Sequence, residues 1–178
     1  MNEPLLILMR HAKSPMGEGG QDDHDRPLND RGLNACRSVA NYLAGRGWQP
    51  EWIWSSDAVR TRQTAEAMLE VWKSKELDVR SQYEPQLYQA SSYRILHYAI
   101  DRWPESVRRL MVIAHNPGMT DAIQQLAQEP LEVPTAAAAV FKLIAAEGPP
   151  TGRPQWFFDG RACEAELLEH VLPKKLAT

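Results

Sequence analysis

The sequence predicts an α/β sandwich whose central sheet is largely parallel. Two short runs, residues 5–9 and 110–114, are apolar throughout, which is typical of strands buried on both faces of a parallel sheet. Around them, segments with apolar residues at helical spacing alternate with further short strand-like runs. Strands that alternate with helices along the chain indicate an α/β protein.

Length and composition limit the class of protein. A chain of 178 residues is long enough for one well-buried domain, so we expect a single domain over residues 1–178. Hydrophobic residues at 43% and charged residues at 24% are the balance of a globular protein. The formal charge of −3 argues against a nucleic-acid binder, which normally shows a basic excess. We expect no nucleic-acid partner.

The N-terminal half contains three predicted strands and two predicted helices. Residues 5–9 form the first strand, and residues 11–28, rich in Gly, Pro, Asp and His, form a loop. Asn29 is the predicted N-cap of a helix that ends at Gly45. The next elements are a strand at residues 52–54, a helix through Val71 with N-cap candidates among Ser55, Ser56 and Asp57, and a weak strand at residues 77–79.

The C-terminal half repeats the alternation. A helix is predicted over residues 92–101, followed by the buried strand at residues 110–114. Residues 115–118 interrupt the pattern before a helix that ends near Ala127. We expect the remaining elements to be strands at residues 136–144 and 155–158, a turn at residues 148–152, and a short helix at residues 164–168.

Basic side chains follow both buried strands directly. Arg10 and His11 come at the end of the first, and His115 comes after the strand at residues 110–114. In open α/β sheets, ligands bind outside the carboxyl ends of the strands. If the two strands are neighbours, both histidines project into one crevice.

Arg60 lies at the start of the helix that follows the strand at residues 52–54. The first turn of a helix favours anions, and a guanidinium binds phosphate through two parallel hydrogen bonds. A crevice with two arginines and two histidines is locally cationic although the chain is slightly acidic. The pattern therefore favours a phosphate site.

Four segments together resemble the signature of the histidine phosphatase superfamily. Residues 9–12 (MRHA) resemble its Arg-His-Gly motif, with Ala12 where glycine is usual. Residues 26–32 (RPLNDRG) are similar to its Pro-Leu-Thr-x-x-Gly segment, with Asn29 in place of threonine. Residues 56–64 resemble its Ser-x-x-x-Arg-x-x-x-Thr segment, which makes Arg60, not Arg62, the family arginine, and residues 112–117 (VIAHNP) match the second histidine motif. The short chain is most similar to the SixA-type phosphohistidine phosphatases.

The resemblance implies the three-layer αβα sandwich of phosphoglycerate mutase-like proteins and a phosphatase that needs no cofactor. His11 is then the nucleophile that forms a phosphohistidine intermediate, while Arg10, Arg60 and His115 hold the phosphoryl oxygens. Arg26 and Asn116 are expected to bind substrate. We expect the neighbours of the two histidines to push their pKa values apart, leaving His11 neutral and His115 cationic.

The leaving group limits the range of possible substrates. An alkoxide needs a proton from a general acid, and the loop after Leu87 shows no carboxylate for this task; Glu84, Asp22, Asp23 and Asp25 stay open as donors. An imidazole leaves more readily, which favours phosphohistidine on a protein, such as a histidine phosphotransfer domain. The alternatives are a small-molecule phosphomonoester phosphatase or mutase of the same superfamily, and a phosphoprotein-binding module without turnover.

The other histidines and the cysteines have simpler interpretations. His24 in its acidic loop, His97 in a helix and His170 in the C-terminal tail are expected at the surface or in packing. The irregular spacing of His11, His24 and His115, next to arginines, argues against a metal site. Two distant cysteines, no long apolar run and no basic N-terminal leader predict a cytoplasmic protein that is not membrane-bound.

Overall fold

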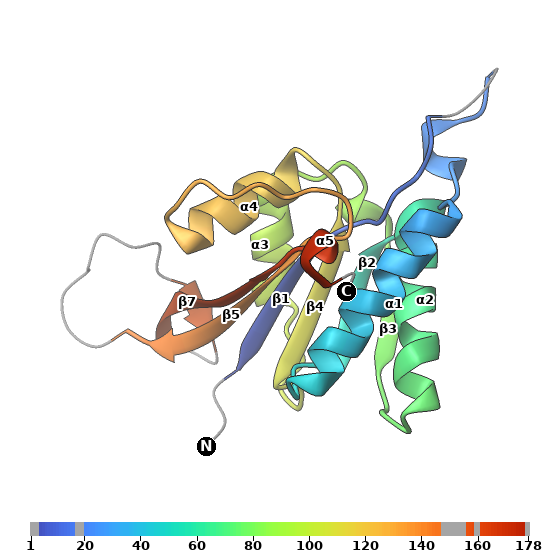
Figure 1. Ribbon diagram of the computed structural model, residues 1–178. Coiled ribbons are helices and arrows are strands. Elements are labelled where there is room, and N and C mark those ends of the chain that lie inside the picture. Colours follow the sequence, from blue (N-terminus) through green and yellow to red (C-terminus); the bar gives the residue numbers. More distant parts are fainter. Residues whose placement is uncertain (1–3, 17–19, 147–155, 159–160, 177–178) are drawn as a thin grey trace.

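A seven-stranded sheet between two pairs of helices forms the centre of the computed structural model (Figure 1). The structure describes all residues except 1–3, 17–19, 147–155, 159–160 and 177–178. The strands are β1 (Leu5–Arg10), β2 (Trp52–Ser56), β3 (Arg80–Glu84), β4 (Arg109–Ala114), β5 (Ala138–Ala145), β6 (Trp156–Phe158) and β7 (Arg161–Val171). The helices are α1 (Asp30–Gly45), α2 (Val59–Ser74), α3 (Ser92–Asp101), α4 (Gly118–Ala127) and α5 (Pro173–Leu176), with short 3-10 turns η1 (Asp23–Asp25) and η2 (Pro85–Leu87).

The sheet has the order β3-β2-β4-β1-β5-β7-β6. The four strands from β3 to β1 run parallel, and β5, β7 and β6 complete the sheet with antiparallel pairs. The helices α1 and α2 cover one face, while α3 and α4 cover the other (Figure 1). The predicted fold class, a three-layer αβα sandwich, is confirmed.

The central strands are buried on both faces, as their apolar runs predict. In β1, Ile7 and Met9 pack with the buried residues of α1 and α2, while Leu6 and Leu8 pack with those of α3 and α4. Successive side chains of a strand point to opposite faces, so an unbroken apolar run is needed when helices cover both. The two-sided core holds β1 and β4 rigidly in the middle of the sheet.

The helices begin and end close to where the sequence predicts. The side-chain oxygen of Asn29 accepts a hydrogen bond from the Gly32 backbone N–H and caps α1, as expected. The predicted helices at residues 92–101 and up to Ala127 are confirmed as α3 and α4.

Two predicted elements are wrong. The predicted helix at residues 164–168 is the middle of β7, because antiparallel pairing with β5 overrides helix propensity. His170 consequently lies in a strand and not in a tail. The weak strand at residues 77–79 is displaced to β3, an edge strand whose polar sequence gives no apolar signal. The expected turn at residues 148–152 lies outside the described residues.

Candidate active site

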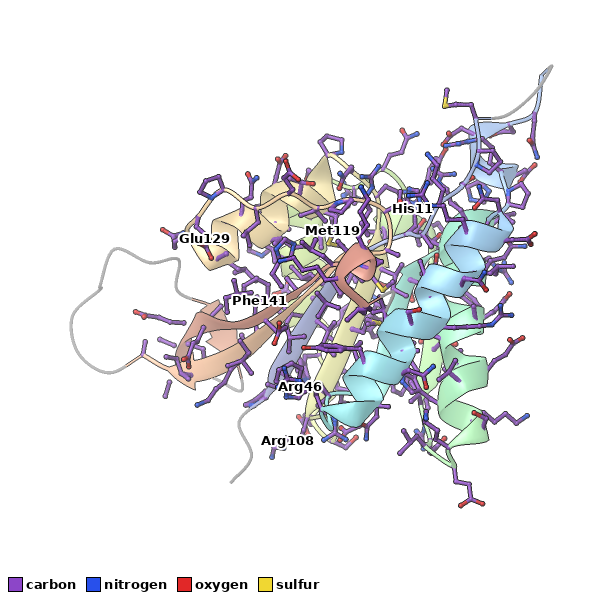
Figure 2. All side chains as sticks on the ribbon, in the orientation of Figure 1. His11, Arg46, Arg108, Met119, Glu129 and Phe141 are labelled. Atoms are coloured by element: carbon purple, nitrogen blue, oxygen red, sulfur yellow. The ribbon has the colours of Figure 1, made fainter. Side chains whose placement is uncertain are left out.

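The carboxyl ends of three neighbouring parallel strands meet at one edge of the sheet. Arg10 ends β1 and pairs with Ala114, which ends β4, so His11 and His115 leave the sheet side by side. Ser56 ends β2, the other neighbour of β4. The predicted adjacency of the two buried strands is therefore confirmed. Figure 2 shows His11 at this end of the molecule, with Arg46 and Arg108 at the opposite end.

A cavity of about 470 Å³ opens at this edge. All six residues that the sequence nominates for the site line it: Arg10, His11, Arg26, Arg60, His115 and Asn116. The other lining residues are Lys13, Ser14, Met16, Asp23, Gln89, Pro117 and Thr135. Four cationic side chains thus surround the cavity, and Asp23 is the sole carboxylate among its described lining residues. The cavity is suited to an anion.

Backbone hydrogen bonds on two sides fix the position of His11. Its N–H donates to the Ala114 carbonyl and its own carbonyl accepts from the Ala136 N–H, both at 3.1 Å. In the side chain, Nδ1 lies 2.8 Å from the Ala12 carbonyl oxygen. Because a carbonyl only accepts, Nδ1 must carry the ring proton and donate it. The Nε2 atom of neutral His11 therefore keeps a free lone pair.

Both site histidines are neutral near pH 7. Burial, together with the charges of Arg60, Arg10 and Arg26, lowers the pKa of His11 to about 4, against the opposing effect of its hydrogen bond to Ala12. Burial and the charges of His11 and Arg60 lower the pKa of His115 to about 3. The expectation of a cationic His115 is wrong for the site without a bound anion, because burial and positive neighbours act on both rings.

Arg60 is buried although it is charged, with 3% of its surface exposed. It lies in the first turn of α2, and its two terminal nitrogens donate to the backbone carbonyl and the carboxylate of Asp23. Arg10 donates from Nη1 to the Val133 carbonyl at 3.0 Å. The Nε atoms of both arginines are buried and lack a hydrogen-bond partner.

Two further polar atoms at the cavity are buried without a partner, namely Nδ1 of His115 and Oδ1 of Asn116. Leaving such atoms unpaired costs about 1–3 kcal/mol each. Four of them gathered around one cationic cavity indicate a site that a polar ligand completes.

Asp23 connects the loop that follows β1 to the arginines. Its carboxylate accepts from Arg60 at 2.8 Å, from Arg26 at 2.7 Å and from the Tyr88 hydroxyl at 2.9 Å. Desolvation raises the pKa of this carboxyl, but the hydrogen bonds from Tyr88 and Arg26 and the charge of Arg60 outweigh it and hold the pKa well below its usual range. Asp23 is therefore ionised. Arg26, half-buried, also donates to the Pro15 carbonyl at 2.7 Å.

The predicted N-cap of α2 is wrong. Ala58 occupies that position without a side-chain cap, because the nominated side chains make other contacts. Ser56 Oγ lies 2.8 Å from Nε2 of His115, and Asp57 lies 3.1 Å from Nε2 of His24. Ser56 is the first residue of the segment that resembles the Ser-x-x-x-Arg-x-x-x-Thr motif, and this position was the available signal for its role.

Tyr88 is a site residue that the sequence reasoning missed. Its ring stacks edge-on against His115, with centroids 5.3 Å apart, and against His24 at 4.9 Å. In a sequence, nothing about a single tyrosine such as Tyr88 distinguishes a site residue from a core residue. His97 and His170 lie on α3 and β7, and neither lines the cavity.

The described residues include no group of three or more His, Cys, Asp and Glu side chains placed to hold a metal ion. None of the helices in the described part of the chain combines the length and apolarity needed to cross a bilayer.

The sequence profile of the histidine phosphatase superfamily (branch 1) matches residues 6–90, which include the segments that carry Arg10, His11 and Arg60. This match covers just under half of the 178 residues, and over it the chain is similar to the histidine phosphatase superfamily. An uncharacterized chloroplastic protein of Arabidopsis thaliana is 30% identical to the chain over 143 residues, which are 77% of this chain and 65% of that protein. The alignment thus spans less than two thirds of this relative.

Solved structures share the superfamily fold over nearly the whole chain. The putative phosphohistidine phosphatase SixA from Agrobacterium tumefaciens has a TM-score of 0.73 at 24% identity, covering 96% of this chain and 99% of that one. The protein histidine phosphatase SixA complexed with tungstate has a TM-score of 0.75 at 21% identity, covering 97% and 99%. Phosphatases named for small molecules have the same fold. The fold therefore leaves the substrate open.

The structure gives physical reasons for the superfamily motifs in this chain. The backbone N–H of Ala12, which stands at the usual glycine position, donates to Thr64 Oγ1 at 3.1 Å. Thr64 Oγ1 in turn donates to the Arg60 carbonyl at 2.7 Å. The Ala12 side chain is buried with no exposed surface, so the extra methyl group is accommodated. Thr64, the last residue of the arginine segment, thus ties the loop after β1 to α2.

Proposed function

We propose that residues 1–178 form one histidine phosphatase domain that removes phosphate from phosphohistidine on a protein, through a covalent phosphohistidine on His11. The observation that carries the proposal is a free Nε2 lone pair on a neutral histidine in the same cavity as two arginines, whose Nε atoms have no hydrogen-bond partner. A neutral imidazole is a nucleophile at neutral pH, and the surrounding cations attract and hold a phosphoryl group.

The reaction runs in two displacements. In the first, His11 Nε2 attacks phosphorus, a new N–P bond forms, and the N–P bond to the substrate imidazole breaks. In the second, water attacks the phosphoryl group on His11, the N–P bond breaks, and the electron pair returns to Nε2 as inorganic phosphate leaves. The Ala12 carbonyl keeps the proton on Nδ1 throughout, so the same nitrogen is regenerated.

Arg10, Arg60 and His115 hold the phosphoryl oxygens in this mechanism. Both arginines line the cavity, and guanidinium groups held in place there stabilise the charge that develops on the phosphoryl oxygens. If the Ser56 hydroxyl donates to Nε2 of His115, the unpartnered Nδ1 carries the proton and becomes a third donor. A bound phosphate dianion raises the pKa of His115, because a nearby negative charge favours the protonated ring. Arg26 and Asn116 line the cavity as further substrate-binding groups.

The state of Asp23 supports a phosphoramidate substrate. It is the carboxylate that lines the cavity, and hydrogen bonds from Tyr88 and Arg26 together with the charge of Arg60 keep it ionised. An ionised carboxylate has no proton to give to a departing alkoxide. The other carboxylates nominated as donors, Glu84, Asp22 and Asp25, do not line the cavity. An imidazole leaving group takes its proton from water near neutral pH, so it needs no such donor.

Turnover assays test the proposal. The full chain, with a metal chelator present, is incubated with a phosphohistidine protein, a phosphoserine peptide and 3-phosphoglycerate, beside His11→Ala and the control His97→Ala. We expect the wild type and the control to hydrolyse the phosphohistidine protein and His11→Ala to be inactive. Preferential turnover of 3-phosphoglycerate would assign a small-molecule phosphatase, and activity in His11→Ala would refute the mechanism.

A further inference from the structure

A second cavity of about 580 Å³ adjoins the candidate active site. Lys13 and Thr135 line both cavities, so one opens beside the other. We call the second cavity the basic groove; its lining residues are Lys13, Arg31, Asn34, Ala35, Ser38, Pro134, Thr135, Pro173 and Lys174. These residues come from the loop after β1, one face of α1, the segment before β5, and α5.

The basic groove carries three cations without a compensating charge. Lys13, Arg31 and Lys174 are exposed, and no Asp or Glu occurs among the lining residues that the structure describes. Within the described part of the chain, none of the three side chains makes an ion pair or a hydrogen bond. In the neighbouring cavity, by contrast, Arg26 and Arg60 are both paired with Asp23. A chain with a net charge of −3 thus gathers unpaired cations beside its active site.

The shape of the groove suits an element of another protein. Arg31, Asn34, Ala35 and Ser38 are spaced at i, i+3, i+4 and i+7, so they form one face of α1. α5 packs beside α1 (Figure 1). The short side chains on this face leave room for a partner above the helix, and the two prolines and Ala35 add apolar surface for contact.

We propose that the basic groove docks an acidic surface of the phosphoprotein substrate, next to the residue whose phosphohistidine enters the cavity at His11. This inference rests on the proposed function. A small metabolite is bound by buried, fixed groups in a site that excludes water, whereas the cations of the groove are exposed and unpaired. Exposed charges of this kind act on a large partner by steering its association and orienting it.

The test uses the double variant Arg31→Glu/Lys174→Glu of the full chain. Both residues line the basic groove and neither lines the candidate active site, whereas Lys13 lines both and is left unchanged. The matched control is Lys75→Glu/Arg108→Glu, which reverses one lysine and one arginine that are also exposed. Arg108 lies at the end of the molecule opposite to His11 (Figure 2).

Two substrates distinguish an effect on docking of the protein from an effect on the catalytic step. One is an acidic histidine phosphotransfer domain phosphorylated on its histidine, and the other is the free amino acid phosphohistidine. We expect the groove variant to raise KM for the phosphorylated domain by about tenfold at low ionic strength, with the effect shrinking in 0.5 M salt. Turnover of free phosphohistidine should match the wild type, and the control should match it on both substrates. Equal effects on both substrates, or none on the domain, would overturn the docking proposal.

Binding measured without turnover distinguishes this inference from the proposed function. His11→Ala is titrated with the phosphorylated domain by calorimetry, with and without the groove substitutions. If the groove substitutions abolish binding but the wild type fails to hydrolyse the domain, the proposed function is refuted and the docking surface is supported. Hydrolysis by the wild type together with unchanged binding in the groove variant would refute the docking surface and support the proposed function.

Discussion

At the scale of single residues, the chemistry depends on the protonation of two histidines in a cationic cavity. The hydrogen bond from His11 Nδ1 to the Ala12 carbonyl selects the tautomer with the proton on Nδ1. Burial and the charges of three arginines lower the pKa of His11. The sequence predicted His11, His115 and the arginines as site residues from their motifs. Their positions after parallel strands also indicated that they meet, because the carboxyl ends of such strands lie at one edge of the sheet. Tyr88 could not be identified, because its role arises from contacts between segments distant in sequence, whereas Ser56 stands in the arginine segment and was interpreted as a helix cap.

The first prediction concerns the titration of His11. NMR of the Cε1–H signals, assigned with His11→Ala, should show an apparent pKa of about 4 for His11, far below the ordinary value of 6.5. The nucleophile is then unprotonated at every pH from neutral down to about 5, so acid inactivation of kcat/KM begins below the usual histidine range. A His11 signal that titrates near 6.5 would show that the ring is solvated and not held as described.

Asp23→Asn tests whether this carboxylate is a general acid. Because Asp23 is already ionised, the substitution should leave kcat on phosphohistidine within about tenfold of the wild type, whereas loss of a general acid costs ~10²–10⁴-fold. Stopped assays with a phosphohistidine protein provide the measurement. A loss in the larger range, accompanied by disappearance of a basic limb in the pH profile, would identify Asp23 as a proton donor.

At the scale of elements, close backbone contacts hold the loop after β1 against α1. A Cβ on Gly32 would lie 2.4 Å from the Lys13 carbonyl oxygen, so only glycine permits this approach. The sequence predicted α1 and its cap because apolar spacing and Asn29 are local signals. It misjudged β7 and β3, because strand pairing with distant segments determines both.

Gly32→Ala should therefore destabilise the fold by about 1–3 kcal/mol and lower kcat, because the loop that carries His11 must shift. The matched control is Gly45→Ala in the same helix, where an added Cβ meets no atom within 4 Å. The control should be neutral or up to ~1 kcal/mol more stable. Urea unfolding and phosphatase assays measure both effects. Equal stability of the two variants would contradict the contact between Gly32 and Lys13.

At the scale of the whole molecule, the fold class follows from the alternation of strands and helices and is correctly predicted. The antiparallel part of the sheet was only partly predicted, because β5 gives a clear apolar signal while β7 is rich in glutamate and leucine. His11 and His115 follow β1 and β4 directly, and their lowered pKa values link the stability of the molecule to pH.

The free energy of unfolding should fall as the pH is lowered from 6.5 towards 4. In this window the unfolded chain protonates its histidines near 6.5, while His11 and His115 stay neutral in the folded protein, with pKa values of about 4 and 3. The unfolded state therefore binds more protons and is favoured. His24 has a raised pKa and acts in the opposite direction, but it is near the surface. Urea unfolding at several pH values should show a flatter dependence for His11→Gln/His115→Gln; an unchanged slope would contradict the assignment.

The most direct measurement of the central claim is detection of the phosphoenzyme. The full chain is mixed with a phosphohistidine protein, quenched at alkaline pH within milliseconds, digested and analysed by mass spectrometry. The account predicts a phosphoryl group on His11 that is absent from His11→Ala, and ³¹P NMR of the trapped species should assign it to Nε2. Rapid turnover with no phosphoryl group on His11, or with one on another residue, would contradict it.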